Sequence, residues 1–211
     1  MDGVILNSMP FHAQAWQNVF KNLGLEITRE EVYAHEGETG EAALRKFLEK
    51  RGRKISPDEA GKLLALKREE FKRIVKIEVF PGVVEFLEKL LHMKKCLAIV
   101  TGTARQELVI SLPTEILQLF QVIITGDEVK QGKPAPEPYI LALEKLQLKA
   151  EQAIVIENAP LGIESAKSAN MICLALTTSL DATCLKAADM IFKNIQEAAN
   201  YLGEKFKIAI N

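Results

Sequence analysis

The carboxylate and amide pair Glu157-Asn158 directly follows an apolar run, residues 153–156. A carboxylate that emerges from a buried strand is costly to leave without a partner. Oxygen donors of this kind suit a hard cation such as Mg²⁺, which prefers octahedral oxygen ligation. Asn158 could also cap a helix that starts at Ala159-Pro160, and both roles can hold at once. The pair is therefore a candidate Mg²⁺ site.

Two other segments suit an anion such as phosphate. Lys133 lies between a glycine and a proline at the expected start of a helix, which restricts the direction of its ammonium group. Helix starts favour anions, and a fixed ammonium adds to this. Thr101 ends the apolar run 96–100, where its hydroxyl and the following backbone N–H groups of Gly102 and Thr103 could hold phosphate oxygens. By itself a Thr-Gly pair is more often a turn.

The elements that would position these residues alternate between helix and strand from about residue 80 onward. Apolar runs predict strands at 96–100, 122–124, 153–156 and 172–176, and helical spacing predicts helices at about 83–91, 104–111, 136–147, 160–169 and 194–202. Continuous apolar strands separated by helices predict a parallel sheet covered on both faces, which is an α/β fold. In such sheets ligands bind beyond the carboxyl ends of the strands, where these polar residues lie.

The first third of the chain differs from the rest, because residues 10–78 contain helical patterns and no strand-like run. Two helices fit 40–51 and 57–75. These helices could simply pack on the sheet, but their number and uninterrupted sequence favour a separate helical cap. We therefore expect an α/β core formed by residues 1–9 and 79–211, with a cap formed by residues 10–78.

Composition and charge exclude several classes of protein. Hydrophobic residues make up 48% and charged residues 26%, as in an ordinary globular domain. The net charge of −1 and the lack of a basic, aromatic-rich patch argue against nucleic-acid binding. No apolar run is long enough to span a membrane and no signal peptide is visible, so we expect a cytoplasmic protein. Cys96 and Cys173 lie in apolar runs and are expected to be buried core residues, without a redox or metal role.

In their order and spacing, Asp2-Gly3-Val4, Thr101, Lys133 and Glu157-Asn158 resemble the four motifs of the haloacid dehalogenase (HAD) superfamily. The resemblance covers nearly the whole chain. It implies a Rossmann-like parallel-sheet core, and the helical insert after the first motif is similar to the α-helical cap of the β-phosphoglucomutase-like branch.

The resemblance also implies roles for individual residues. Asp2 would protonate the leaving group and then activate water, and its backbone carbonyl would bind Mg²⁺ together with Glu157 and Asn158. Thr101 would hold phosphoryl oxygens and Lys133 would neutralise charge. The residues expected to contact the substrate are Gly102, Thr103, His12, Glu38 and Thr39.

The chain departs from the family pattern at the nucleophile. The attacking aspartate belongs two positions before Asp2, and Met1 is the first residue of this sequence. The apolar strand that carries that aspartate is central in the family's sheet. Its loss would remove several buried side chains at roughly 2–5 kcal/mol each, against a typical stability of roughly 5–15 kcal/mol. We therefore expect the nucleophile just before Met1, which would be the middle residue of the Asp-x-Asp motif.

Two further departures concern charge. Asn158 replaces an aspartate found in many relatives, which predicts weaker Mg²⁺ binding. In the cap, Gly40 stands where β-phosphoglucomutases carry an arginine that grips a second phosphate, and Glu38 and Glu41 flank it. Lys67 or Arg68 could substitute for that arginine.

These features favour a phosphatase that hydrolyses a small phosphorylated metabolite, similar to a sugar phosphate, through an aspartyl-phosphate. A β-phosphoglucomutase is the first alternative. A non-catalytic phosphate-binding or interaction module is the second. We expect a monomer or weak homodimer, with no nucleic-acid or membrane partner.

Overall fold

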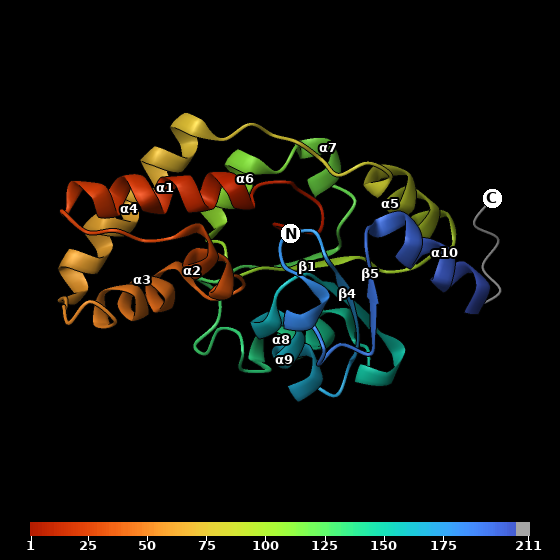
Figure 1. Cartoon of the computed structure of the whole chain (residues 1–211). Helices are drawn as coiled ribbons and strands as arrows, with labels where there is room; N and C mark the ends of the chain where they lie inside the picture. The colour runs from red at the N-terminus through yellow and green to blue at the C-terminus, as the bar shows by residue number, and fades with distance from the viewer. Residues whose placement is uncertain (206–211) are drawn as a thin grey trace.

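The computed structural model describes residues 1–205 and confirms the α/β class (Figure 1). The strands are β1 (Ala98–Val100), β2 (Val122–Ile124), β3 (Ile154–Glu157), β4 (Ile172–Leu176) and β5 (Met190–Phe192). The helices are α1 (Met9–Asn22), α2 (Arg29–Ala34), α3 (Gly40–Glu49), α4 (Pro57–Ile74), α5 (Val83–His92), α6 (Arg105–Ser111), α7 (Thr114–Leu117), α8 (Glu137–Leu146), α9 (Pro160–Ser168) and α10 (Ile195–Lys205).

All strand pairs are parallel, and helices cover both faces of the strands. Along β4, Leu174 and Leu176 pack with α5 and α10, whereas Cys173 and Ala175 pack with α8 and α9. This alternation follows from the two-residue period of a strand. It explains why β4 is apolar from Cys173 to Leu176: both of its faces are buried there, and Ile172 at its start is exposed.

The strands form two separate sheets within residues 1–205. β1 pairs with β2 in one sheet, and β3-β4-β5 form the other. One apolar cluster nevertheless joins them, because Ile99 of β1 and Leu174 of β4 both belong to it. β1 and β3 thus each keep an edge without a ladder partner among the described residues.

The four helices α1 to α4 lie together on the left of Figure 1, beside the core. Their apolar side chains form a cluster that includes Trp16, Phe20, Leu44 and Phe47. Local sequence sets the helix starts: Thr39 accepts a hydrogen bond from the Ala42 amide at the start of α3. Ser56 and Glu59 form a capping box at the start of α4.

The chain enters and leaves these four helices through two segments that run side by side. The Asn7 amide donates to the Glu78 carbonyl at 2.8 Å, and the Phe80 amide donates to the Ile5 carbonyl at 2.9 Å. Leu6 and Val79 form an antiparallel bridge between them. Two adjacent crossings of this kind are a suitable hinge for a cap.

Several details of the secondary structure differ from the sequence-based expectations. Cys96 is exposed, because β1 starts only at Ala98, and the prediction that Cys96 is a buried core residue is therefore wrong. Cys173 is buried as expected. The short elements α2, α7 and β5 were not predicted, since six, four and three residues are too few to show a clear period. No helix in the described part of the chain is long and apolar enough to cross a membrane.

Candidate active site

A cavity of about 640 Å³ lies between the four-helix cap and the carboxyl ends of the strands. All of the catalytic, substrate and metal residues expected from the sequence line it: Asp2, His12, Glu38, Thr39, Thr101, Gly102, Thr103, Lys133, Glu157 and Asn158. Residues separated by more than 150 positions in the sequence thus meet at one place. This gathering is what the parallel sheet provides, because each residue follows a strand end or a cap connection.

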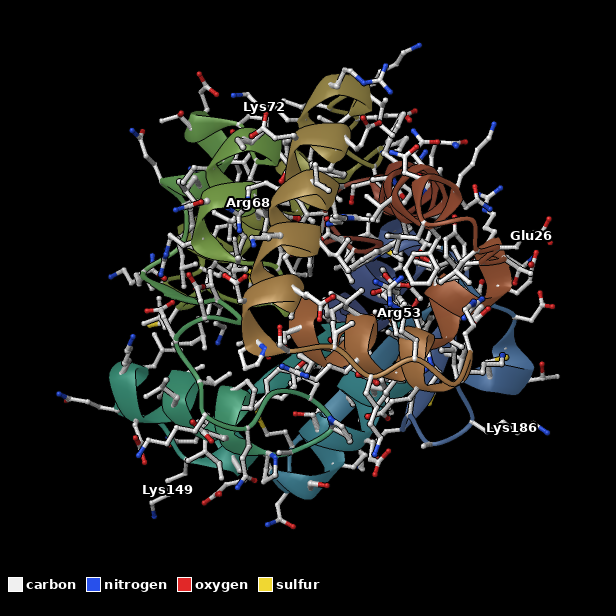
Figure 2. All side chains as sticks on the ribbon, turned by 90° about the vertical axis from the view of Figure 1, so that its left-hand side faces the viewer. Glu26, Arg53, Arg68, Lys72, Lys149 and Lys186 are labelled. Atoms are coloured by element: carbon white, nitrogen blue, oxygen red, sulfur yellow. The ribbon has the colours of Figure 1, made fainter. Side chains whose placement is uncertain are left out.

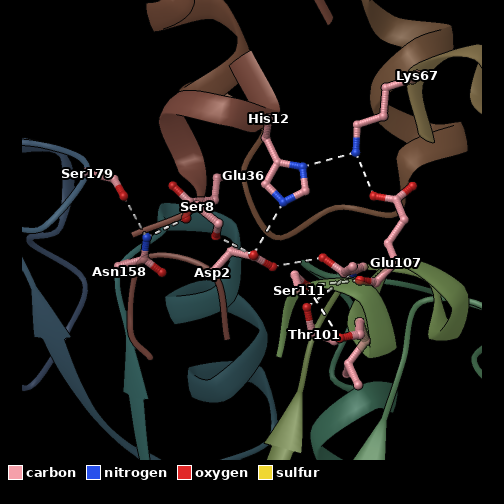
Figure 3. Close-up of polar contacts among 12 residues, drawn as sticks. Asp2, Ser8, His12, Glu36, Lys67, Thr101, Glu107, Ser111, Asn158 and Ser179 are labelled. Atoms are coloured by element: carbon pink, nitrogen blue, oxygen red, sulfur yellow. Dashed lines mark hydrogen bonds and ion pairs between the residues drawn. The ribbon is translucent and has the colours of Figure 1, made fainter. Parts of the chain in front are cut away.

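Three side chains hold the carboxylate of Asp2 (Figure 3). Ser8 donates to Oδ1 at 2.5 Å, and His12 Nε2 lies 3.3 Å from the same oxygen. Thr103 donates to Oδ2 at 2.8 Å. Burial opposes ionisation of Asp2, but His12, the N-terminal amino group and Ser8 together outweigh it and hold the pKa of Asp2 well below its usual range. Asp2 is therefore an oriented, ionised carboxylate.

His12 and Thr103, expected to contact substrate, thus act first on Asp2. His12 also stacks on Phe71 of α4, with ring centroids 4.1 Å apart, and its Nδ1 lies 3.0 Å from Lys67 Nζ. Lys67 in turn donates to Glu107 Oε2 at 2.7 Å. A continuous polar chain therefore runs from α6 of the core, through α4 of the cap, to Asp2.

Lys133 and Glu157 form a buried ion pair, with Lys133 Nζ 2.5 Å from Glu157 Oε1. Tyr139 donates to the same oxygen at 3.0 Å, and the backbone amides of Asn158 and Ala159 donate to Oε2. Although burial disfavours its charged form, the adjacent ammonium of Lys133 lowers the pKa of Glu157. Lys133 also donates to the Val100 carbonyl at 3.1 Å, which places its ammonium beside the end of β1.

Glu36, a residue of the cap that the sequence did not single out, lies against Asn158. Asn158 Nδ2 donates to Glu36 Oε1 and, at 3.0 Å, to the Ser179 hydroxyl. Glu36 is 7% exposed, and its Oε2 is buried without a hydrogen-bond partner among the described residues. Burial, together with the nearby carboxylates of Glu157 and Asp2, raises the pKa of Glu36 well above its ordinary value.

The loop between α2 and α3, residues 35–39, rests directly on the core; we call it the cap loop. A Cβ on Gly102 would lie 2.2 Å from the Glu38 carbonyl oxygen, and one on Gly132 would lie 2.8 Å from Thr39 Cγ2. A Cβ on Gly37, at φ +92°, would lie 3.5 Å from Lys133 Cδ. The glycines of the core therefore make room for the cap loop, and the cap is closed on the site.

The cation that could grip a second phosphate is not supplied at Gly40, which lines the cavity without a side chain. Lys67 is held by Glu107 and His12, so its ammonium is already occupied. Arg68 lies where α4 meets α6 and donates to Gln106 at 2.7 Å (Figure 2). Of the two proposed substitutes, Arg68 alone keeps a guanidinium nitrogen, Nε, without a hydrogen bond among the described residues.

The donor set can be compared with what Mg²⁺ requires. Within residues 1–205 no three His, Cys, Asp or Glu side chains are grouped closely enough to form a metal site by themselves. Mg²⁺ usually takes only one or two carboxylates and completes its shell with water and substrate phosphate. Asp2, Asn158 and Glu36 offer oxygen donors around Gly3, and Oε2 of Glu36 has no hydrogen-bond partner among the described residues. A Cβ on Gly3 would lie 1.8 Å from Asn158 Nδ2 and 2.9 Å from Glu36 Oε1. These residues fit a Mg²⁺ ion.

Sequence reasoning missed four contributors to the site: Ser8, Glu36, Tyr139 and Glu107. Ser8 lies six residues after Asp2 and could have been considered as its partner. Tyr139 and Glu107 lie on helices one turn after a motif, which is a weak signal. Glu36 is one of several glutamates in an acidic stretch, so its burial could only be learned from the fold.

Comparisons with known proteins agree with the motifs. The family model described as haloacid dehalogenase-like hydrolase matches residues 1–176. A validoxylamine A 7'-phosphate phosphatase from Streptomyces hygroscopicus is 32% identical over 93% of this chain and 92% of its own length. A phosphorylated carbohydrates phosphatase from Thermotoga maritima is 32% identical over 81% of this chain and 79% of its own length. Among solved structures, a candidate β-phosphoglucomutase from Bacteroides vulgatus superimposes with a TM-score of 0.87 at 33% identity, covering 99% of this chain and 88% of that one.

Proposed function

The chain belongs to the haloacid dehalogenase-like hydrolases, and from this premise we propose that it is a Mg²⁺-dependent phosphatase acting on a small, sugar-like phosphorylated metabolite. The observation that carries the proposal is the carboxylate of Asp2, fixed by Ser8, His12 and Thr103, which lines the cavity between cap and core. An oriented carboxylate at that place can accept a proton from an attacking water and, once protonated, pass it to a leaving group.

Each residue then has a chemical task. Asp2, as the ionised carboxylate, accepts a proton from the water that hydrolyses the aspartyl-phosphate, and once protonated it delivers that proton to the leaving oxygen of the next substrate molecule. The Thr101 hydroxyl and the Gly102 amide hold phosphoryl oxygens. Lys133 neutralises their charge. Asp2, Asn158 and Glu157 would hold Mg²⁺, which would supply further neutralisation of the phosphoryl group.

The attacking carboxylate belongs two positions before Asp2, at the end of a strand that would lie between β1 and β3. The separation of the strands into a β1-β2 sheet and a β3-β4-β5 sheet supports this proposal. Ile99 on one side and Leu174 on the other already share an apolar cluster, so an apolar strand between them would extend an existing core. It would also satisfy two sheet edges at once.

The cavity favours hydrolysis over mutase activity. Its volume of about 640 Å³ suits a small organic phosphate. Glu36 and Glu38 of the cap loop and Glu41 line it, so a second phosphate would meet carboxylates. Lys67 is paired with Glu107, so only Arg68 is left of the two cations that could offset these carboxylates. β-Phosphoglucomutase activity remains the second candidate, favoured by the similarity to the Bacteroides vulgatus structure.

The relatives named above act, by their names, on phosphorylated carbohydrates and on a validoxylamine phosphate. This supports sugar-like phosphates as the first substrates to try. We further propose a cytoplasmic enzyme that works as a monomer or weak homodimer. The second alternative, a non-catalytic phosphate-binding or interaction module, would not require a carboxylate oriented by three side chains, as that of Asp2 is.

The test compares three proteins in a Mg²⁺-dependent assay with p-nitrophenyl phosphate and sugar phosphates. One is the 211-residue chain, and one carries an added apolar strand that ends in aspartate directly before Met1. The third is identical to the second except that the added aspartate is asparagine. We expect hydrolysis only by the second, abolished by EDTA. Equal hydrolysis by the first and third would show that another group attacks phosphorus and would contradict the mechanism.

A further inference from the structure

The carboxyl group of Glu36 is buried in the site with only one of its two oxygens hydrogen-bonded among the described residues. It is 7% exposed, one of its oxygens has no hydrogen-bond partner among the described residues, and it belongs to the cap although its neighbours belong to the core. Buried polar atoms are nearly always paired, so an unpaired carboxylate oxygen indicates a missing partner. That partner must be positive, or a donor.

Among the described residues the Met1 amino group is a positive charge near Glu36, but it makes no hydrogen bond to Oε2. Asn158 already donates to Oε1, and the Asp2 and Glu157 carboxylates are the nearest charges of its own sign. Lys133 is engaged by Glu157 and by the Val100 carbonyl. In its ionised form Glu36 would repel a phosphate oxygen. A cation at the Asp2-Asn158 side of the cavity would instead be attracted.

Because Asn158 is neutral, a cation bound beside it would have one negatively charged ligand fewer than a cation bound beside an aspartate. The Asn158 side chain offers a neutral amide where many members of the family offer a carboxylate, and the amide oxygen accepts no hydrogen bond from the described residues. Glu36 brings one carboxylate to within hydrogen-bond distance of that same side chain. The loss of charge at one position is therefore matched by a gain at the neighbouring one.

We propose that Glu36 is a cap-borne ligand of the divalent cation, bound directly or through one water, and that it makes up for the neutral Asn158. This inference rests on the proposed Mg²⁺-dependent function. Because Glu36 moves with the cap while Asp2 and Asn158 belong to the core, cation binding and cap closure stabilise each other. Such coupling is reciprocal: a closed cap raises affinity for the cation, and the cation holds the cap closed.

Glu38 provides a matched control for the test. It lies in the same cap loop, is also 7% exposed, and also has an unpaired Oε2 among the described residues. Its other oxygen, however, contacts Lys46 at 2.6 Å and His35 at 3.0 Å and makes no hydrogen bond to Asn158. Glu36→Gln and Glu38→Gln thus remove the same charge from the same loop, one beside the expected cation and one beside Lys46.

The experiment measures Mg²⁺ binding to the 211-residue chain by titration calorimetry, without substrate. We expect Glu36→Gln to weaken binding by at least roughly tenfold, the range typical of residues that support a metal site. Glu38→Gln should bind as the unchanged chain does. Adding Asn158→Asp to Glu36→Gln should restore most of the affinity, because it returns the charge to the site.

A second readout follows the cap itself. Mg²⁺ should slow proteolysis of the connections at residues 5–8 and 75–80 in the unchanged chain and in Glu38→Gln, but not in Glu36→Gln. Circular dichroism checks that each variant is folded, and Glu36→Asp, whose shorter carboxylate cannot reach as far, serves as a second probe. Equal Mg²⁺ affinity in Glu36→Gln and the unchanged chain would overturn the inference alone. An unchanged chain that binds no Mg²⁺ would overturn the metal-dependent function together with it.

Discussion

Lys67 of the cap and Glu107 of the core form an ion pair across the boundary between the two parts, with Nζ and Oε2 2.7 Å apart. Both side chains are nearly buried, at 8% and 11% exposure. The ammonium also contacts His12, whose other ring nitrogen faces Asp2. The closed position of the cap is thus linked, through three side chains, to the residue proposed to transfer protons.

Replacing Lys67 by Met should destabilise the protein strongly. The change leaves Glu107 buried without its main partner, and loss of one member of a buried pair costs about 3–5 kcal/mol. Urea unfolding of the variant measures this loss. Lys62→Met is the control, because its pair with Asp58 on the same helix is 72% and 77% exposed and should contribute little. Equal effects of the two changes would show that the Lys67-Glu107 pair is not a firm contact.

Replacing His12 by Gln should raise the pKa of Asp2 toward its ordinary value of 3.8. Burial alone favours the neutral carboxyl, and His12 supplies the charge and hydrogen bond that oppose it. Carbon-detected NMR titration of the Asp2 carboxyl measures the change. His92→Gln is a suitable control, since His92 is exposed and lies at the end of α5. An Asp2 pKa that does not move in His12→Gln would remove His12 from the proposed proton-transfer group.

Replacing Lys133 by Met should reverse the pH dependence of the contribution that Glu157 makes to the free energy of unfolding. In the unchanged chain burial raises the pKa of Glu157, but Lys133 and its other partners outweigh burial, so the folded-state pKa lies below 4.5. The stabilising contribution of Glu157 is therefore present above pH 4.5 and is lost as the pH falls through the folded-state pKa. Without Lys133, burial dominates and the folded-state pKa rises above that of the unfolded chain. The contribution then grows as pH falls.

The measurement is the unfolding free energy between pH 3 and pH 7 for both proteins in the absence of Mg²⁺. The difference in stability between the unchanged chain and Lys133→Met should be largest at pH 7 and should shrink on acidification. A difference that is constant across this range would mean that Lys133 does not control the charge of Glu157.

The sequence was informative about the core of this site because the chemistry there is carried by short motifs at strand ends. Thr101 follows β1, Glu157 ends β3 and Lys133 lies in the loop between β2 and α8, and the parallel strands bring the three together. The α/β class was likewise predicted from continuous apolar runs and is confirmed. In contrast, Cys96 was misplaced because the apolar run is two residues longer than the strand it predicts.

The contribution of the cap could not be predicted in the same way. Glu36 and Glu38 lie two positions apart in an acidic stretch that the sequence suggests is exposed, yet both are buried and they contact different partners. Nothing in local periodicity distinguishes them, because the difference arises from how the cap loop rests on the core. Long-range pairs such as Lys67-Glu107 depend on the same docking.

Asn158→Asp should tighten Mg²⁺ binding while destabilising the metal-free protein. The new carboxylate would face Glu36, which now accepts a hydrogen bond from the amide of Asn158. Repulsion between the two is relieved only when a cation lies between them. Melting temperatures in EDTA and in Mg²⁺ should therefore differ more for the variant than for the unchanged chain. An unchanged metal titration would contradict this prediction.

The seating of the cap loop on the core can be tested by a steric change and its reversal. A Cβ added at Gly132 would lie 2.8 Å from Thr39 Cγ2, closer than such carbons approach one another. Gly132→Ala should therefore hinder cap closure and lower kcat/KM of the form with the added aspartate by roughly tenfold or more, in line with the cost of misplacing catalytic groups. Thr39 is one of the residues expected to contact the substrate.

Thr39→Ser removes the obstructing methyl group but keeps the hydroxyl that accepts from the Ala42 amide at the start of α3. We expect Gly132→Ala combined with Thr39→Ser to recover most of the activity, whereas Thr39→Ser alone should change it little. The recovery would show that the loss comes from contact between the cap loop and the core and not from the backbone at Gly132. If the double variant is as impaired as Gly132→Ala, the cap loop does not rest on Gly132 during catalysis.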